Sequence, residues 1–168
     1  MKKVLMMLLI LTFLTGCTVV RIDTKSIDNI VGVVLSKDNT LANINGKGYK
    51  YYLPRGVVNI DSSDFNEKLY CNGEYYYLYL DVISYYYKKD FEYTEKKDVY
   101  YSKFINQNNK KGYLEITNMD DKYYLIEFMY NYAKIEALVT KENINEVVLN
   151  SSYILSTIKY NDNVIKLI

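Results

Sequence analysis

The chain has 168 residues, a formal net charge of +1, two cysteines, and neither histidine nor tryptophan. Without histidine, histidine-based catalytic triads and zinc sites with histidine ligands are excluded. The near-neutral charge argues against a nucleic-acid partner, which needs a concentrated basic surface. No glycine-rich phosphate loop and no calcium-loop pattern occurs, so we expect no metal and no cofactor.

The first 16 residues have the layout of a secretory signal peptide. Met1–Lys3 gives a positively charged start, Val4–Leu14 is apolar, and small residues precede Cys17. The alternative is an uncleaved membrane helix that continues through Val19 and Val20. Spanning a bilayer takes about 20 apolar residues, and this run is interrupted by threonines and glycine, so the signal peptide is favoured.

The four residues Leu14-Thr15-Gly16-Cys17 resemble the lipobox of bacterial lipoproteins. The resemblance implies that the Cys17 sulfur carries a diacylglycerol unit and that residues 1–16 are removed. It also implies a lipid-anchored protein in the cell membrane that faces outside the cytoplasm, with two or three acyl chains for stable anchoring. Residues 17–26 are the expected tether, and residues 27–168 form one domain.

With Cys17 lipidated, Cys71 has no intramolecular disulfide partner. We interpret Cys71 as a small buried or half-buried residue, because the chain offers no histidine and no obvious cation to activate a thiolate. Tyrosine accounts for 21 residues. Together with the many lysines, asparagines and isoleucines, these tyrosines indicate an AT-rich bacterial coding sequence, with carbohydrate or ligand stacking as the alternative explanation.

The first half of the domain changes from a helical pattern to short strands. Apolar residues recur at helical spacing over residues 27–35, after the candidate caps Thr24 and Ser26, and a strand over residues 30–36 is the alternative. Strands are predicted at residues 49–53, 57–60 and 68–71. Turns are predicted at Pro54-Arg55-Gly56, in a loop at residues 61–64, and at Asn72-Gly73.

The run from Tyr75 to Tyr87 is predicted as the longest strand. Because side chains alternate between the two faces of a strand, Leu78, Leu80 and Val82 should face the core. The opposite row is amphipathic, and we predict its members as ligand-contact residues: Tyr75, Tyr77, Tyr79 and Asp81. The alternative is that a helix covers this row and makes its tyrosines ordinary core residues.

The second half of the domain predicts a meander followed by a helix. Residues 88–98 are too charged for a core and should form a surface excursion. Strands at residues 99–105, 113–117, 123–130 and 134–140 have connections too short for parallel pairing. A helix capped by Thr140 should cover the sheet with one apolar stripe, which consists of Ile144, Val147, Val148, Leu155 and Ile158. Residues 164–168 should pair at the sheet edge or pack beneath the helix.

These elements predict an α+β fold in which helices flank an antiparallel β-sheet. Tyr49–Leu53, Tyr77–Ile83, the meander and the final helix ending in Ile154-Leu155-Ser156-Thr157-Ile158 resemble the PsbP-type α/β sandwich of small exported lipoproteins. The resemblance covers residues 44–160. It implies binding or assembly roles and transfers no catalytic residue, because that fold has no shared active site.

The function expected from these observations is a non-catalytic binding or assembly module of the cell envelope. Its partner would be an envelope protein, a glycan or a small ligand, in addition to the membrane itself. One alternative is a carboxylate-dependent hydrolase that uses Asp81, Glu115 or Glu127, although exposed carboxylates on strands usually only solvate a sheet face. The other alternative is a purely structural envelope lipoprotein. We assign no catalytic residue.

Overall fold

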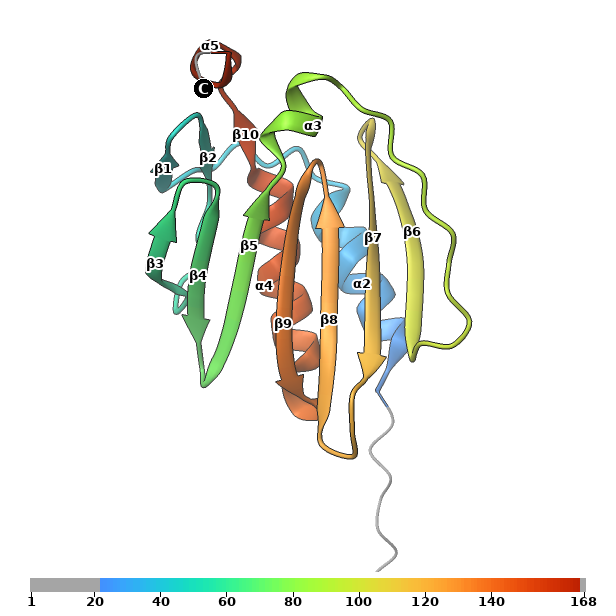
Figure 1. The fold of residues 1–168 in the computed structure, drawn as a ribbon. Helices are drawn as coiled ribbons and strands as arrows, with labels where there is room; N and C mark the ends of the chain where they lie inside the picture. Colours follow the sequence, from blue (N-terminus) through green and yellow to red (C-terminus); the bar gives the residue numbers. More distant parts are fainter. Residues whose placement is uncertain (1–21, 167–168) are drawn as a thin grey trace, which may run out of the picture.

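The structure is a computed structural model that describes residues 22–166 (Figure 1). Its helices are α2 (Thr24–Leu35), α3 (Val82–Tyr86), the 3₁₀ turn η1 (Lys141–Asn143), α4 (Ile144–Thr157) and α5 (Asp162–Ile165). Its strands are β1 (Ile44–Gly46), β2 (Tyr49–Tyr51), β3 (Val58–Ser63), β4 (Asn66–Cys71), β5 (Glu74–Leu80), β6 (Tyr101–Gln107), β7 (Lys110–Asn118), β8 (Tyr123–Tyr130), β9 (Ala133–Thr140) and β10 (Lys159–Tyr160).

Two antiparallel sheets and two long helices make up the fold. The large sheet has the strand order β3-β4-β5-β9-β8-β7-β6, and the small sheet has the order β1-β2-β10. Helices α2 and α4 pack against each other and lie behind the large sheet, on one of its faces (Figure 1). The predicted α+β class, with an antiparallel sheet and flanking helices, is thereby confirmed.

The first element of the domain, for which a helix and a strand were both considered, is the helix α2. Its buried residues follow helical spacing: Ile27, Val31, Val34 and Leu35. The N-cap is Asp23, whose side chain accepts a hydrogen bond from the Lys25 backbone N–H at 3.1 Å. The strand alternative was therefore wrong, as were the caps Thr24 and Ser26. Residues 24–26, predicted as part of the tether, form the first turn of this helix.

The strands before the hairpin differ from their predicted bounds. Strand β2 ends at Tyr51, before the predicted Leu53, whereas β3 extends to Ser63 through residues predicted as a loop. Strand β3 is an edge strand that pairs with β4 through a register shift between Asn59 and Asp61. An edge strand with mostly exposed side chains shows no apolar row, so alternation did not reveal its full length.

The hairpin turn at Asn72-Gly73 is confirmed, because both residues adopt positive φ angles of 49° and 91°. Strand β5 follows, but it ends at Leu80 instead of continuing to Tyr87. The Asp81 side chain accepts a hydrogen bond from the Ser84 backbone N–H at 2.9 Å and caps α3. Such a local side-chain bond to the backbone competes with strand pairing. Asp81 therefore does not extend the tyrosine row.

The predicted meander is confirmed as β6-β7-β8-β9, with each strand antiparallel to the next. The meander returns toward the first half of the chain, because β9 pairs with β5. Residues 88–100, which we call the strap, connect α3 to β6 and pass along the edge of the sheet beside β6 (Figure 1). The predicted surface excursion at residues 88–98 lies within the strap.

Helix α4 has the predicted apolar stripe, and every member of it is buried, including Leu155 at 0% exposure. Fully burying one such side chain contributes about 1.5 to 3 kcal/mol. The turn η1 precedes the helix, and Thr140 makes no side-chain capping bond there. After α4, β10 pairs with β2, and Ile165 of α5 is buried.

The predicted signal peptide and Cys17 lie outside the described residues. Between Ile22 and Lys166, no helix has the length and apolar character that crossing a bilayer requires. Ile22 itself is buried against the domain.

Candidate functional site

The candidate site is the outer face of the large sheet, which we define as the face opposite α2 and α4. The strap lies over β6 and β7 on this face, whereas over β4, β5 and β9 the side chains meet solvent. We call this second part the open half. Its side chains are Lys68 and Tyr70 of β4, Tyr75, Tyr77 and Tyr79 of β5, and Lys134, Glu136 and Leu138 of β9.

The predicted tyrosine row lies on the open half. Tyr75, Tyr77 and Tyr79 are 45%, 40% and 37% exposed, so no helix covers them and the core alternative was wrong. Two lysines lie over these rings. The Lys68 Nζ is 4.5 Å from the Tyr75 ring centre, and the Lys134 Nζ is 5.5 Å from that of Tyr79. These cation–π contacts hold the rings in place without covering them.

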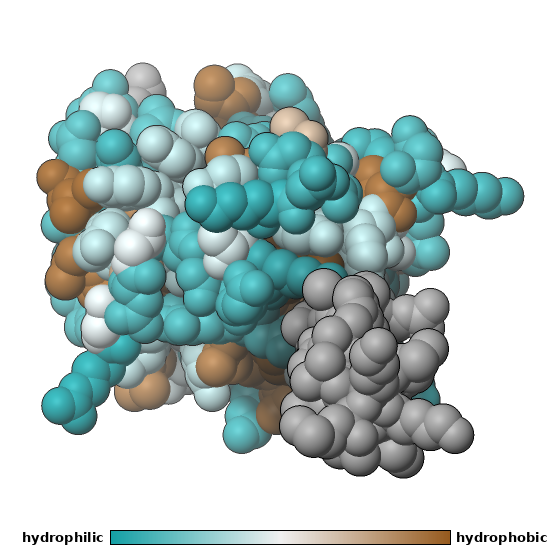
Figure 2. Space-filling model, turned by 90° about the horizontal axis from the view of Figure 1, so that it is seen from below, coloured by the Kyte–Doolittle hydropathy of each residue, from teal (hydrophilic) through white to brown (hydrophobic). Residues whose placement is uncertain are grey.

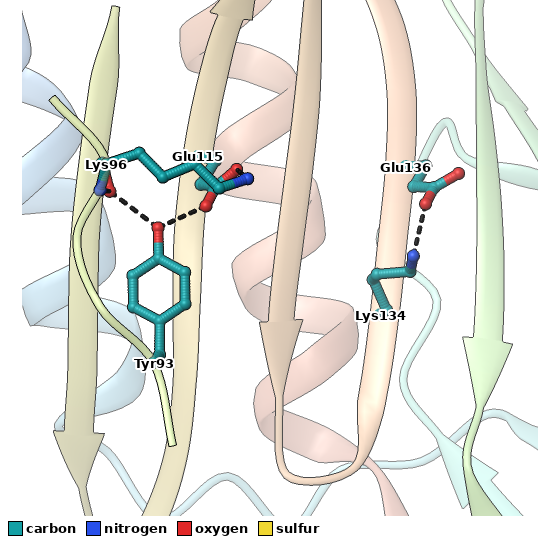
Figure 3. A network of polar contacts seen from close by, with 6 residues as sticks. Tyr93, Lys96, Glu115, Lys134 and Glu136 are labelled. Atoms are coloured by element: carbon teal, nitrogen blue, oxygen red, sulfur yellow. Dashed lines mark hydrogen bonds and ion pairs between the residues drawn. The ribbon is translucent and has the colours of Figure 1, made fainter. Parts of the chain in front are cut away.

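The strap covers its half of the face through an aromatic stack. The Tyr93 ring stacks on Tyr113 of β7 with ring centres 4.6 Å apart and planes 3° apart, and Phe91 stacks on Tyr113 at 5.9 Å. The Tyr93 hydroxyl donates a hydrogen bond to Glu115 at 2.5 Å, and the Lys96 Nζ reaches the other carboxylate oxygen at 2.8 Å (Figure 3). The strap is thus attached by stacking and by charge.

The contacts of the strap shift the pKa values of the side chains that make them. Burial, and then the hydrogen bond to Glu115, raise the pKa of Tyr93 to about 12. Burial also raises the pKa of Tyr113 to about 12, with further contributions from Glu127 and Glu115. The hydrogen bond to Glu115 raises the pKa of Lys96, so that its ammonium is charged at neutral pH.

Three glutamates occupy one row across neighbouring strands. Glu115 of β7 pairs in register with Glu127 of β8, which pairs with Glu136 of β9, and Glu136 pairs with Tyr77. Lys134 forms an ion pair with Glu136 (Figure 3). Among the described residues, Glu127 makes no hydrogen bond or ion pair with another side chain. Within this part of the chain, no group of acidic or cysteine side chains is arranged to hold a metal ion.

The structure brings two of the three candidate catalytic carboxylates together, but not in a catalytic arrangement. Glu115 is only 2% exposed and is already bound by Tyr93 and Lys96. Asp81 caps α3 and is not part of the row. Three cavities of about 170, 670 and 290 Å³ contain one carboxylate each, respectively Asp90, Asp162 and Asp38. None of these three cavities has the carboxylate pair that a hydrolase of this type needs.

Cys71 is buried, as the sequence predicted. Its Sγ lies 3.6 Å from the Glu146 carboxylate. Burial and this negative neighbour raise the pKa of the Cys71 thiol. The thiol therefore stays protonated at neutral pH, which opposes a nucleophilic role.

Sequence reasoning missed a buried carboxylate at the junction of the two sheets. Glu67 of β4 is 4% exposed and accepts hydrogen bonds from the hydroxyls of Tyr49 and Tyr51, at 2.6 and 2.5 Å, and from the Asn59 amide. Alternation along the strand could have revealed it, because Glu67 is two residues before the buried Leu69 and therefore lies on the same face of β4. These bonds tie the small sheet to the large one, which indicates a structural role.

Comparison of the chain with models of known protein families and with curated proteins finds no match. The inference of function therefore depends on the sequence motif at Cys17 and on the geometry of the outer face.

Proposed function

We propose that the protein is a lipid-anchored, non-catalytic binding module on the outer side of the cell membrane, which holds an envelope protein against the open half. The observation that carries this proposal is the exposed row of Tyr75, Tyr77 and Tyr79 on β5, a strand that is paired on both sides within the large sheet. Tyrosine has a rigid ring and a polar tip, and it loses little conformational entropy on binding, so it suits recognition at a wet surface.

The strap indicates the kind of segment that this face accepts. It is an irregular stretch of chain that places Phe91 and Tyr93 on Tyr113 and the ammonium of Lys96 on Glu115. The same surface continues in register through Glu127 of β8 to the open half, with its tyrosine rings and the carboxylate of Glu136. An extended partner segment that carries aromatic and basic side chains would find equivalent contacts there.

The alternatives have less support. A hydrolase needs two available carboxylates, and Glu115 is occupied by Tyr93 and Lys96. A small ligand is usually enclosed in a cavity of about 300 to 1,000 Å³, whereas the tyrosine row lies on an open sheet. The resemblance to PsbP-type lipoproteins, which have binding and assembly roles, agrees with the proposal.

The anchor is tested by metabolic labelling with a fatty-acid analogue. The wild-type chain should incorporate the label and fractionate with membranes. The variant Cys17→Ala should lose the label, because the sulfur that accepts the lipid is gone, and it should accumulate as an unprocessed precursor or leave the membrane. Absence of label on the wild type would refute the anchor.

The binding face is tested by the double variant Tyr77→Ser/Tyr79→Ser, with Tyr153→Ser as a matched control. Tyr153 is 36% exposed but belongs to α4, on the other side of the sheet. Cross-linking in intact membranes, followed by affinity purification, should recover a partner protein with wild type and control but not with the double variant. Unfolding midpoints should stay close for all three. Full partner recovery with the double variant would refute the binding face.

A further inference from the structure

Residues at one end of the large sheet surround the point where the described chain begins. Ile22 precedes α2 at the lower end of the molecule in Figure 1, and its carbonyl accepts a hydrogen bond from the Tyr100 hydroxyl at 3.4 Å. The β7–β8 turn, the start of β6 and the end of β9 lie at this same end (Figure 1). We call it the lower end.

Chain length limits how far the lower end can be from the anchor. Five peptide units separate Cys17 from Ile22. Even fully extended, five residues span at most about 18 Å. Strand β8 has 8 residues, and at about 3.4 Å per residue it is longer than this reach. If the opposite end of the sheet met the membrane, Ile22 would be farther from the bilayer than the chain allows.

We infer that the lower end docks on the lipid headgroups of the membrane, so that the large sheet stands upright on the bilayer. This inference rests on the lipid anchor proposed at Cys17. Strand β5 begins at the lower end and runs upward (Figure 1), so the row from Tyr75 to Tyr79 points away from the bilayer. The open half then stays accessible to a partner while the domain is held close to the membrane.

The side chains at the lower end suit the headgroup layer. Met119 in the β7–β8 turn is 56% exposed, and Tyr100 is 40% exposed. Lys122 in the same turn is exposed, with its Nζ 4.9 Å from the Tyr123 ring centre. Tyrosine and lysine place an apolar body and a polar tip at the boundary between lipid and water.

The surroundings of these residues argue against deep insertion. In the same turn, Asp121 is exposed and Asp120 accepts hydrogen bonds from two backbone N–H groups. Figure 2 views the molecule from below, and in the part of this face that is not drawn in grey, hydrophilic residues lie between the hydrophobic groups. A surface of this kind contacts headgroups and does not enter the hydrocarbon.

The orientation is tested with the lipidated full chain in vesicles of phosphatidylcholine and phosphatidylglycerol. Three variants, Met119→Cys, Lys47→Cys and Tyr77→Cys, each carry one fluorophore, and quenching by a lipid-borne quencher is measured. Lys47 lies in the β1–β2 turn at the opposite end, and Tyr77 reports on the open half. The wild-type chain treated with the same reagent gives the background, because Cys71 is buried.

The label at Met119 should be quenched several-fold more strongly than the other two. Equal quenching at Met119 and Lys47 would overturn the docking. Strongest quenching at Tyr77 would overturn it as well, because the sheet would then lie flat on the membrane. Vesicle flotation is measured on the same samples: failure to float would refute the anchor itself, whereas flotation with the wrong quenching pattern refutes only the orientation.

Discussion

Two consecutive tyrosines of β5 show how the two faces of the large sheet differ. Tyr76 is 0% exposed, and its hydroxyl accepts a hydrogen bond from the Asn150 amide of α4 at 3.2 Å. The next residue, Tyr77, is 40% exposed and lies on the outer face. The position of a tyrosine in the alternation along the strand, and not its residue type, decides whether it supports the fold or is available for recognition. A tyrosine-rich composition alone therefore does not identify a binding surface.

Alkaline pH should have the largest effect on the free energy of unfolding, because it ionises tyrosines that are buried in the folded protein. Burial raises the pKa of Tyr130 to about 12, and burial raises the pKa of Tyr76 as well. The ordinary value is 10.0. Because the folded pKa lies above the unfolded one, the stability that Tyr130 contributes is complete below about pH 10 and is lost as the pH rises through about 12, and the contribution of Tyr76 also falls as the pH rises above about 10. Each costs about 1.4 kcal/mol per pH unit in this window.

The measurement is the free energy of unfolding by denaturant titration from about pH 9 to about pH 12, together with the phenolate absorbance. Stability should fall progressively across the window. A constant unfolding free energy over this range would contradict the assignment of the buried tyrosines.

The next prediction separates the neighbouring tyrosines directly. Tyr76→Ala should lower the free energy of unfolding by about 3 to 5 kcal/mol, as is typical when a large buried aromatic side chain is truncated. Tyr77→Ala should cost about 1 kcal/mol or less, because it removes an exposed ring and a weak cation–π contact with the Lys68 Nζ, which is 5.6 Å from the ring centre. Chemical denaturation of both variants checks this. Similar losses for both would mean that the two faces are not energetically distinct.

The same alternation explains which parts of the fold could be predicted from the sequence. Strand β8 was predicted with its observed bounds, Tyr123–Tyr130, because it is a run of apolar and aromatic residues between polar connections, and every second residue of it is buried. The end of β5 was missed because the pattern continues past Leu80, while the cap at Asp81 is a local hydrogen bond that alternation does not encode. Strand β3 was predicted too short because its last residues are polar and exposed.

Only part of the candidate site could be predicted in this way. The row of Tyr75, Tyr77 and Tyr79 follows from parity in one strand. Its exposure does not, because exposure depends on which face the helices cover. The pairing of Glu115 with Glu127 depends on the register set by the β7–β8 turn, and the contacts of the strap depend on tertiary packing of a segment with no periodicity.

Smaller effects on the free energy of unfolding than that of Tyr76→Ala are expected for Glu115 and Glu127, which are neighbours in the row of glutamates across the outer face. Glu115→Gln should lower the free energy of unfolding by about 1 to 2 kcal/mol, because it removes the charge that holds Lys96 and weakens the bond from Tyr93. The strap should become more sensitive to protease as it loosens. Similar protease sensitivity in wild type and variant would mean that aromatic stacking alone holds the strap.

Glu127→Gln is the matched change, one strand away. Glu127 faces Glu115 and Glu136 in register, and directly opposed like charges destabilise a sheet. Removing its charge should therefore leave the free energy of unfolding unchanged or raise it by up to about 0.5 kcal/mol, and added salt should reduce the gain because it screens the repulsion. Denaturant titration at low and high salt measures this. A clear loss of stability would show that Glu127 has a stabilising partner in solution, and the glutamates beside the strap would then stabilise the fold in the same way as Glu115 beneath it.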